Sequence, residues 1–462
     1  MSCAADLGAK QSEAMTIGRR DLVLGGIGAG LAAAAGARAA AAREEPEMPA
    51  PFSTYGIVPG GGIDQTASLQ EAADKAAQSG TPFFLPPGDY TTAKLALKSG
   101  TEIQGVPGKS VLRYDGGGGA LISIEDAAGI RLTGLTLDGE AKPIDGGALL
   151  IANGVKGLNL SECLIVGSAA DGVVLRKVSG RITDCEIGDI RGGGLFSEDA
   201  TGLEISHNHV RDCGDNGILV WRSAVAEDGT IVTANRIERI TAKSGGSGQN
   251  GNGINVFRAG SVMVSNNRIT DCAFSAIRSN SGSNCQMIGN SCARLGEVAL
   301  YAEFAFEGAV IANNIVDDAA MGISVTNFNE GGRLAVVQGN LIRNIFFRKD
   351  ADSRGVGIAV EADSVVSGNV IETAPGYGIM IGWGRYLRDV SVTGNLIRNA
   401  HIDIGVSTDA LAGTALISDN LISGAKDGAI RAMNGATPTG PDLATASAEA
   451  YRNLVVSTNV AR

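Results

Sequence analysis

Short apolar runs alternate with glycine, asparagine and other polar residues along most of this chain. One copy of the pattern has an apolar run at 309–312, Asn314, a second run at 315–316 and a Gly-Ile-Ser-Val run at 322–325. Runs of this length, rich in Ile, Val and Leu, are typical of β-strands and are too short for helices. Each copy of the pattern therefore predicts three short strands separated by turns.

An asparagine recurs in each copy, and the residue two positions after it is aliphatic or, once, a cysteine. Successive asparagines are 23 to 33 residues apart, and a repeat of this length predicts one supersecondary unit stacked on copies of itself. The ten positions are Asn208, Asn235, Asn267, Asn290, Asn314, Asn340, Asn369, Asn395, Asn420 and Asn453. Cys163 and Cys185 fill the same place upstream, before Ile165 and Ile187.

These repeats predict an all-β, right-handed parallel β-helix. Three strands and three turns in each repeat would form one coil, giving a solenoid of about a dozen rungs spaced about 4.8 Å apart. Each asparagine is expected at a sharp bend, where it tolerates a left-handed backbone, and stacked asparagines should form a hydrogen-bonded ladder. The 66 glycines suit the turns, and the aromatic content of 4% suits a narrow aliphatic core.

The chain begins with a segment of a different kind. Arg19 and Arg20 precede a Gly/Ala-rich apolar stretch through Ala34, and small residues at 37–42 offer an Ala-x-Ala cleavage site. Residues 1–42 resemble a twin-arginine (Tat) export signal, which implies passage through the Tat translocase to a periplasmic or secreted location. No stable membrane span is expected after processing. The alternative is a chance Arg-Arg pair before a membrane anchor, but the apolar run is short for one.

Charge narrows the classes of partner. Residues 1–42 carry four basic and three acidic side chains, which leaves 34 basic and 46 acidic residues, a net charge of −12. This balance argues against nucleic acid as a partner. An anionic polysaccharide would need a locally basic groove.

The cysteines and the three histidines predict little chemistry. Cys213 and Cys272 are expected in one column two rungs apart, about 10 Å, too far for a disulfide. No cluster has zinc-ligand spacing. His207 and His209 flank Asn208 and could share a metal, but no third ligand is evident, so exposed flanking residues are the favoured interpretation. The sequence holds no dinucleotide, haem or iron–sulfur motif, and it predicts no cofactor.

Residues 43–115 differ from the repeats and predict an N-terminal cap with the first rungs. Thr66–Ala77 has helical periodicity and Gly80 would end it, so a capping helix over the open first rung is expected. Residues 116–462 are then the β-helix repeats with a C-terminal cap. Whether 437–449 belongs to that cap or is a loose tail is left open.

Part of the cap carries a family resemblance. Asp64, Thr66, Leu69, Gln70 and Ala72, then Leu85 to Tyr90 (Leu-Pro-Pro-Gly-Asp-Tyr) and Ile103 to Gly105, resemble the start of the pectate-lyase-like β-helix superfamily. With the export signal and the asparagine repeats, the whole chain is similar to twin-arginine-translocated β-helix repeat proteins, a family without assigned activity. The resemblance implies the fold, and raises Ca²⁺ as a cofactor by analogy.

The catalytic motifs of that superfamily are largely missing. Of the polygalacturonase motifs only Asp317-Asp318 is present, and the Asp-Pro-His of mannuronan epimerases and the calcium cluster of pectate lyases are not recognisable. No activity can be carried over residue by residue.

The resemblance places a substrate groove on the outer face of the Gly-Ile-x-Val strand, where outward residues stack in two columns. The first column is predicted to be Val174, Phe196, Leu219, Asn255, Arg278, Tyr301, Ser324, Ala359 and Met380, and the second Arg176, Glu198, Trp221, Phe257, Asn280, Glu303, Thr326 and Glu361.

Residues in the middle of these columns suit carbohydrate chemistry. Trp221 and Phe257 would be an aromatic platform for a sugar ring. Tyr301 and Glu303 are candidate acid/base groups. The other candidates are the basic strip of Arg222, Arg258 and Arg278, which suits a carboxylate, the neighbouring Glu198 and Asn255, and a second patch at Trp383, Arg385 and Tyr386.

The leading hypothesis is an exported polysaccharide lyase, hydrolase or epimerase acting on an anionic glycan. Its catalytic residues would be Arg278, Tyr301 and Glu303, with a polysaccharide or oligosaccharide as partner. The alternative is a non-catalytic glycan-binding or envelope-structural solenoid, which the missing motifs favour. A third interpretation, a cofactor loaded before export, lacks a motif.

Overall fold

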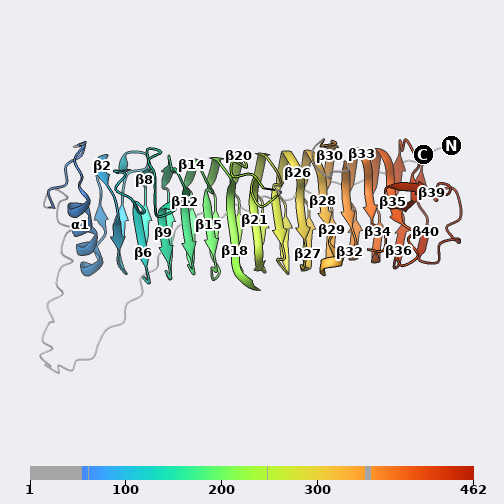
Figure 1. The fold of residues 1–462 in the computed structure, drawn as a ribbon, viewed down its shortest axis with the longest axis horizontal. Helices are drawn as coiled ribbons and strands as arrows, with labels where there is room; N and C mark the ends of the chain where they lie inside the picture. Colours follow the sequence, from blue (N-terminus) through green and yellow to red (C-terminus); the bar gives the residue numbers. More distant parts are fainter. Residues whose placement is uncertain (1–54, 61, 247, 349–354) are drawn as a thin grey trace, which may run out of the picture. The chain divides into compact units, whose positions relative to one another are not determined.

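The computed structural model describes residues 55–60, 62–246, 248–348 and 355–462. The predicted export signal at 1–42 lies outside these residues. Within the described residues the chain winds as a parallel β-solenoid, with strands of successive coils side by side along one axis (Figure 1). No helix in this part of the chain is long and apolar enough to cross a membrane.

Each coil contributes strands to three faces of the solenoid, which we call the first, second and third ribbons. The first ribbon is a parallel sheet whose strands precede the asparagine of each repeat. Its strands are β1 (Phe83–Phe84), β4 (Glu102–Gln104), β7 (Arg131–Thr133), β10 (Leu158–Ser161), β13 (Gly180–Thr183), β16 (Glu204–Ser206), β19 (Ile231–Thr233), β22 (Met263–Ser265), β25 (Cys285–Ile288), β27 (Glu307–Ala312), β29 (Arg333–Gln338), β32 (Ala362–Ser367), β34 (Arg388–Thr393), β36 (Ala415–Ser418) and β40 (Leu454–Ser457).

The second ribbon follows the asparagine. Its strands are β2 (Gly88–Thr92), β5 (Ser110–Tyr114), β8 (Leu135–Asp138), β11 (Leu164–Val166), β14 (Glu186–Ile190), β17 (His209–Cys213), β20 (Arg236–Ile240), β23 (Arg268–Cys272), β30 (Leu341–Ile345), β37 (Leu421–Ser423), β41 (Val460–Ala461) and the first halves of β26 (Ser291–Glu303), β28 (Ile315–Val325), β33 (Val370–Ile381) and β35 (Leu396–Ser407).

The third ribbon carries the Gly-Ile-x-Val runs. Its strands are β3 (Leu95–Leu97), β6 (Ile122–Glu125), β9 (Ala148–Asn153), β12 (Asp171–Arg176), β15 (Leu195–Glu198), β18 (Asn216–Glu227), β21 (Asn252–Gly260), β24 (Ile277–Asn280), β31 (Val356–Val360), β38 (Ile430–Asn434) and the second halves of β26, β28, β33 and β35. The prediction of three strands in each repeat is confirmed.

The core is a set of aliphatic columns inside the coils. Ile254, Ile277, Leu300, Ile323 and Ile358 pair in register from one rung to the next on the third ribbon, and each is fully buried. Burying such side chains is the main favourable contribution to folding. Outward residues on the same strands are consequently held at fixed rung spacing.

The asparagine ladder is present. In each step, the backbone N–H and the side-chain amide of one asparagine donate to Oδ1 of the next, as from Asn290 to Asn314 at 2.8 and 3.0 Å. The amide also donates to a carbonyl of the preceding coil, as from Asn314 Nδ2 to Met287 O at 2.9 Å. Cys185 takes the place of an asparagine at the start, where its N–H donates to Asn208 Oδ1.

Two predictions about the ladder are wrong in detail. The last member is Asn459, whose Oδ1 accepts from Asn420 at 2.9 Å, and Asn453 lies outside the ladder, bonded to the carbonyl of Gly413. The left-handed residue of each bend is the one before the asparagine, such as His207 or Ala234, with φ of 58° and 56°. The amide must point inward to meet its neighbours, so the preceding residue takes the strain of the bend.

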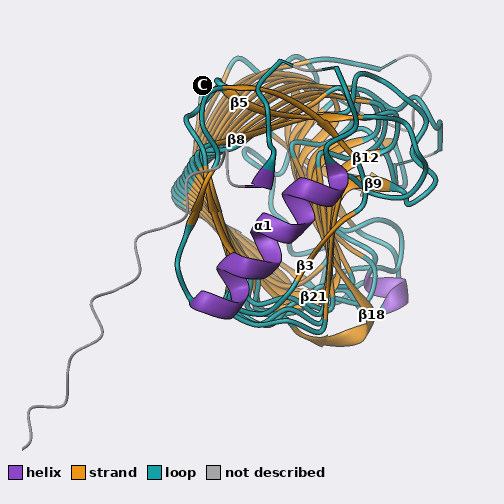
Figure 2. Ribbon diagram, turned by 90° about the vertical axis from the view of Figure 1, so that its left-hand side faces the viewer, coloured by secondary structure: helices purple, strands orange, loops and turns teal. Residues whose placement is uncertain are grey.

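A helix covers the first coils, as predicted. Helix α1 (Thr66–Ser79) ends at Gly80, whose φ of 65° is left-handed. The buried face of the helix consists of its own residues Leu69, Ala72, Ala73 and Ala76. Figure 2 shows α1 lying across the end of the solenoid, where it shields the apolar interior of the first rungs.

The other end of the solenoid is closed by the C-terminal segment. Strand β39 (Thr437–Thr439) turns back antiparallel to β38, and Leu443 is buried. The carboxylate of Asp442 accepts hydrogen bonds from the N–H groups of Ala429, Ile430 and Ala444. Residues in the 437–449 segment therefore contact the last coil.

We expect Asn314→Ala to lower the free energy of unfolding by about 3 kcal/mol, because it leaves buried donors of Asn290 without an acceptor. Asn453→Ala, outside the ladder, should cost about 1 kcal/mol or less, since it removes a single hydrogen bond. Urea denaturation followed by circular dichroism measures both. Equal losses in the two variants would contradict the ladder described above.

Asp403 makes stability depend on pH. It is fully buried, its Oδ2 has no hydrogen-bond partner among the described residues, and burial raises its pKa to about 7. The unfolded chain releases this proton near pH 4, about the usual value. The folded state therefore holds the extra proton between these values, and the free energy of unfolding should fall as pH rises from about 4 to about 7.

Asp403→Asn should remove this slope and melt at a higher temperature than the natural chain at about pH 8, where the buried carboxylate is charged. Thermal melts across this pH range give the difference between the two proteins. The exposed Asp389→Asn serves as the control and should leave the slope unchanged. A slope that persists in Asp403→Asn would assign the effect to other groups.

Candidate functional site

The outer face of the third ribbon has the register that the sequence predicts. In the first column each residue pairs with the one on the next rung, in the order Phe196, Leu219, Asn255, Arg278 and Tyr301. In the second column Glu198, Trp221, Phe257, Asn280 and Glu303 pair in the same way. The parallel ladder holds each of these side chains next to its neighbour in the column.

Three aromatic rings form a row across this face. The ring centroids of Phe196 and Trp221 are 5.3 Å apart in an edge-to-face arrangement, and those of Trp221 and Phe257 are 5.2 Å apart. The predicted platform of Trp221 and Phe257 thus extends one rung further, to Phe196. Flat, fixed rings of this kind suit the apolar face of a ring-shaped ligand.

A cavity of about 310 Å³ opens beside this row. It is lined by Trp221, Gln249, Asn255, Phe257, Arg278, Asn280 and Phe304. Four residues predicted as a site, Trp221, Asn255, Phe257 and Arg278, are thereby brought together. Gln249, Asn280 and Phe304 were not singled out from the sequence.

Arg278 and Glu303 form a buried ion pair. Arg278 Nε lies 2.5 Å from Glu303 Oε1, and Asn280 Nδ2 donates to the same oxygen at 2.9 Å. Glu303 is only 2% exposed. Charge-assisted hydrogen bonds of this kind fix the carboxylate and turn the guanidinium plane. Glu303 therefore faces Arg278 and not the cavity.

The remaining groups around Arg278 point to recognition. Nη1 of Arg278 is buried and has no hydrogen-bond partner in the part of the chain that the structure describes. The guanidinium carbon lies 5.5 Å from the centroid of the Tyr301 ring. Burial raises the pKa of the Tyr301 phenol above its ordinary value, so the hydroxyl stays protonated at neutral pH and can donate a hydrogen bond.

Backbone from the long turn before β21 approaches Arg278 closely. A Cβ on Gly248 would lie 1.5 Å from Arg278 Nη1, so a glycine is required there. Buried amides hold the turn: Asn216 and Asn255 donate to Gln249 O, both at 3.1 Å, and Asn252 donates to Gly248 O at 2.9 Å. The sequence held a signal for this, an asparagine directly before Gly217 and Gly253.

Three predicted binding residues lie apart from this cavity. Glu198 pairs with Arg176 at 3.2 Å, and Arg258 lies over the outer side of the Phe257 ring at 4.7 Å. Arg222 donates to the carbonyl of Ala200. Each arginine of the predicted basic strip binds a carbonyl or a carboxylate of its own: Arg222 binds Ala200 O, Arg258 binds Ser223 O and Arg278 binds Glu303.

A second cavity of about 200 Å³ adjoins the first on earlier rungs, and Trp221 lines both. Its other lining residues are Asp171, Gly193, Phe196, Asp215, Asn216, Leu219 and Asn250. The aromatic row thus runs from one cavity to the other. The sequence pattern did not point to its two aspartates, because Asp171 begins β12 and Asp215 directly precedes β18, outside the two columns.

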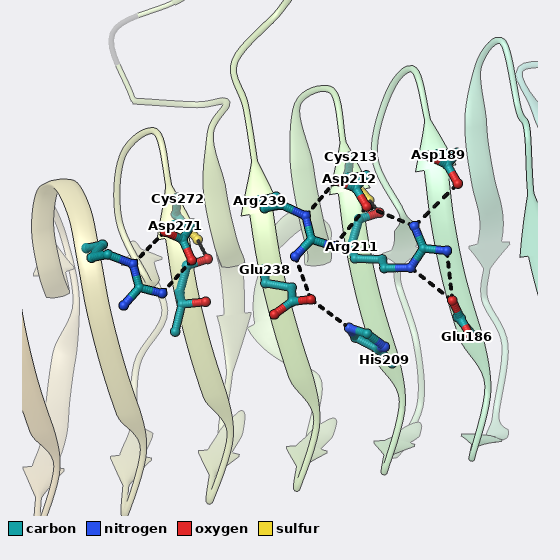
Figure 3. Close-up of polar contacts among 12 residues, drawn as sticks. Glu186, Asp189, His209, Arg211, Asp212, Cys213, Glu238, Arg239, Asp271 and Cys272 are labelled. Atoms are coloured by element: carbon teal, nitrogen blue, oxygen red, sulfur yellow. Dashed lines mark hydrogen bonds and ion pairs between the residues drawn. The ribbon is translucent and has the colours of Figure 1, made fainter.

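The histidine region on the second ribbon is a charge network (Figure 3). His209 Nε2 lies 3.1 Å from Glu238 Oε1, Arg211 pairs with Glu186 at 2.8 Å, and Arg239 binds Asp212 at 2.7 Å. Hydrogen bonds from Arg239 and then Arg211 lower the pKa of Asp212 to about 2. Among the described residues no group of three metal-binding side chains occurs. These groups stabilise neighbouring rungs.

The second predicted patch is a tight turn. Trp383 N donates to Tyr386 O at 3.2 Å, and Tyr386 N donates back to Trp383 O at 3.0 Å. Neither ring lines either of the two cavities on the third ribbon.

Arg278→Met should lower the free energy of unfolding by about 3–5 kcal/mol, because it leaves the charge of Glu303 buried and unpaired. Adding Glu303→Leu should recover most of this loss, since the pair then becomes apolar. Arg176→Met, which breaks a half-exposed pair on the same face, should cost about 1 kcal/mol at most. Chemical denaturation of the natural chain, the two single variants and the double variant measures these differences in the free energy of unfolding. A double variant as unstable as Arg278→Met would contradict the buried pair.

Solved structures with the same architecture include proteins of very different kinds. The pre-mature bacteriophage phi29 gene product 12 aligns with a TM-score of 0.51 and 15% identity over 83% of this chain, which spans about half of that protein's length (55%). PfbA, a surface adhesin of Streptococcus pneumoniae, aligns with a TM-score of 0.48 and 14% identity over 85% of this chain and 94% of its own. A mannuronic acid-specific family 6 polysaccharide lyase from human gut microbiota aligns with a TM-score of 0.49 and 15% identity. The alignment covers 86% of this chain and 91% of the lyase. At these identities the likeness concerns the fold alone.

Among curated proteins, none matches the sequence significantly. The model of the family described as "right handed beta helix region" matches residues 146–227, 171–338 and 216–397. Together these matches cover residues 146–397, which are 252 of the 462 residues. The chain therefore belongs to the right-handed β-helix family.

Proposed function

We propose that this protein binds a polysaccharide along the outer face of the third ribbon and acts on it there. The observation that carries the proposal is the row of Phe196, Trp221 and Phe257, which runs between two adjoining cavities. A chain of sugar units presents a ring at regular intervals, and an aromatic row on a solenoid offers matching faces at rung spacing.

Arg278 supports an anionic glycan. Arg278 lines the larger cavity, its buried Nη1 has no protein partner among the described residues, and Glu303 binds the guanidinium through Nε. A sugar carboxylate is a fitting acceptor for this buried donor. The amides of Asn255 and Asn280 and the phenol of Tyr301 are nearby donors. In the proposal, Arg278 reads the acidic group, Glu303 positions Arg278, and Tyr301 donates to the substrate.

The reaction is that of a lyase, a hydrolase or an epimerase, the classes that act on such chains. Export through the twin-arginine pathway to the periplasm or beyond belongs to the same proposal, and the arginine pair at 19–20 supports it. A glycan outside the cytoplasm would then be the substrate.

A non-catalytic glycan-binding protein is the second candidate. The observation in its favour is that Arg278 and Glu303, both predicted as catalytic, bind each other at 2.5 Å. A buried pair of this kind orients a ligand without transferring a proton to it. Both candidates share the binding surface and differ in whether a product forms.

Trp221→Ala and Phe257→Ala should each weaken polysaccharide binding about tenfold, because each removes a stacking face. Affinity electrophoresis on a panel of uronate-containing and neutral polysaccharides measures the retention. Phe84→Ala, an exposed aromatic on the first ribbon, is the matched control and should bind as the natural chain does. Retention unchanged in both groove variants, or no retention of the natural chain by any polymer, would contradict the proposal.

A further inference from the structure

Two aspartates, Asp171 and Asp215, line the smaller cavity. Asp171 begins β12, and Asp215 directly precedes β18 two rungs later. The strand register places Gly193 on the rung between them, and its N–H donates to Asp171 Oδ1 at 2.7 Å. Two rungs separate the backbones by about 10 Å, and both aspartates line the same cavity.

Two glycines make room for the side chains of Asp171 and Leu219 in this cavity. A Cβ on Gly192 would lie 2.3 Å from Asp171 Oδ1, and one on Gly193 would lie 2.9 Å from Leu219 Cδ1. Neither residue has positive φ, so the absence of a side chain, and not the backbone conformation, is what the site requires. Any larger residue on this rung would fill the cavity or displace Asp171.

The two aspartates differ in their surroundings. Both oxygens of Asp215 accept hydrogen bonds from Ser244, from N at 2.8 Å and from Oγ at 2.7 Å. Burial raises the pKa of Asp171, opposed by the Gly193 hydrogen bond, and the negative charge of Asp215 raises it further. A carboxyl group that burial helps to keep protonated is suited to the acid role, and a second carboxyl group on the same cavity wall is available as the base.

The aromatic row leads into this cavity. Phe196 and Trp221 line it together with the two aspartates, so a glycan that stacks on the row would lie beside both residues. By contrast, the carboxylate of Glu303 does not line the larger cavity and is bound by Arg278 and Asn280. Recognition and proton transfer would then occupy neighbouring positions on one groove.

We propose that Asp171 and Asp215 are the general acid and the general base for hydrolysis of a glycosidic bond. Asp171 gives its proton to the glycosidic oxygen as the bond from that oxygen to the anomeric carbon breaks. A water oxygen bonds to the anomeric carbon and loses a proton to Asp215. The products are two shorter chains, one with a new reducing end, and proton exchange with solvent restores both aspartates. This inference rests on the proposed function and names its reaction.

The variants Asp171→Asn and Asp215→Asn test this acid/base assignment. The substrate is the polysaccharide that binds the natural chain most strongly in affinity electrophoresis. The amide oxygen introduced by Asp171→Asn still accepts from the Gly193 N–H, so the fold should hold, and a thermal melt checks this. Both variants should bind within about threefold of the natural chain, while release of reducing ends falls 10²–10⁴-fold, about the contribution of an acid or base. The limb of the pH–rate profile at high pH, where Asp171 loses its proton, should disappear in Asp171→Asn.

Asp199→Asn is the matched control. Asp199 lies on the same ribbon and accepts from Ser223 N at 3.0 Å and Ser223 Oγ at 2.8 Å, as Asp215 does from Ser244, but it lines neither cavity. The Asp199→Asn variant should release reducing ends at the rate of the natural chain. A second readout is a 2,4-dinitrophenyl glycoside of the same sugar, on which Asp171→Asn should regain activity because this leaving group needs no acid.

The outcomes separate this inference from the proposed function. Binding that depends on Trp221 but yields no reducing ends, or aspartate variants that cleave at the natural rate, would overturn the acid/base assignment and leave the binding groove intact. Failure of every polymer to bind would overturn the proposed function, and this inference with it.

Discussion

The whole solenoid depends on stacking every coil at one spacing, and the asparagine ladder is the interaction that enforces it. Each Oδ1 accepts from both the backbone and the side chain of the asparagine before it, so neither can shift without losing both bonds. These groups are buried, and unpaired buried amides are costly. The ladder holds one corner of each coil in register, and the parallel strands carry that register to the other faces. The two columns of the third ribbon are a consequence.

Because the register is fixed, residues at equivalent positions of successive repeats are neighbours on the surface. Trp221 and Phe257 are far apart in the chain, yet their rings are 5.2 Å apart because one rung separates them. Arg278 reaches Glu303 in the same way. The same rule builds the charge network at Arg211, where opposite charges occupy successive rungs of the second ribbon and favour that register over a shifted one.

The fold and the columns were predictable because they depend on period alone. What the sequence could not show depends on turns of irregular length. The end of the ladder at Asn459 was missed because the last coil is longer, 39 residues after Asn420, and Asn453 also precedes an aliphatic residue by two. The two cavities depend on the turn that ends at Asn252 and on bare glycines at 192–193. Whether Glu303 faces a ligand or Arg278 is decided by side-chain rotamers, which no periodicity encodes.

The ladder has a direction, since each asparagine donates to the next asparagine toward the C-terminus and accepts from the previous one. A coil inserted or deleted whole would present the same donors and acceptors to both neighbours, and the core columns would close in the same manner. Length is therefore a property that such a chain can change by duplication without redesigning its interior. The rungs around Trp221 are different, because their aromatic rings, glycines and aspartates belong to particular coils. Evolution could lengthen the scaffold freely on either side of them while these few coils remain a single, indivisible unit.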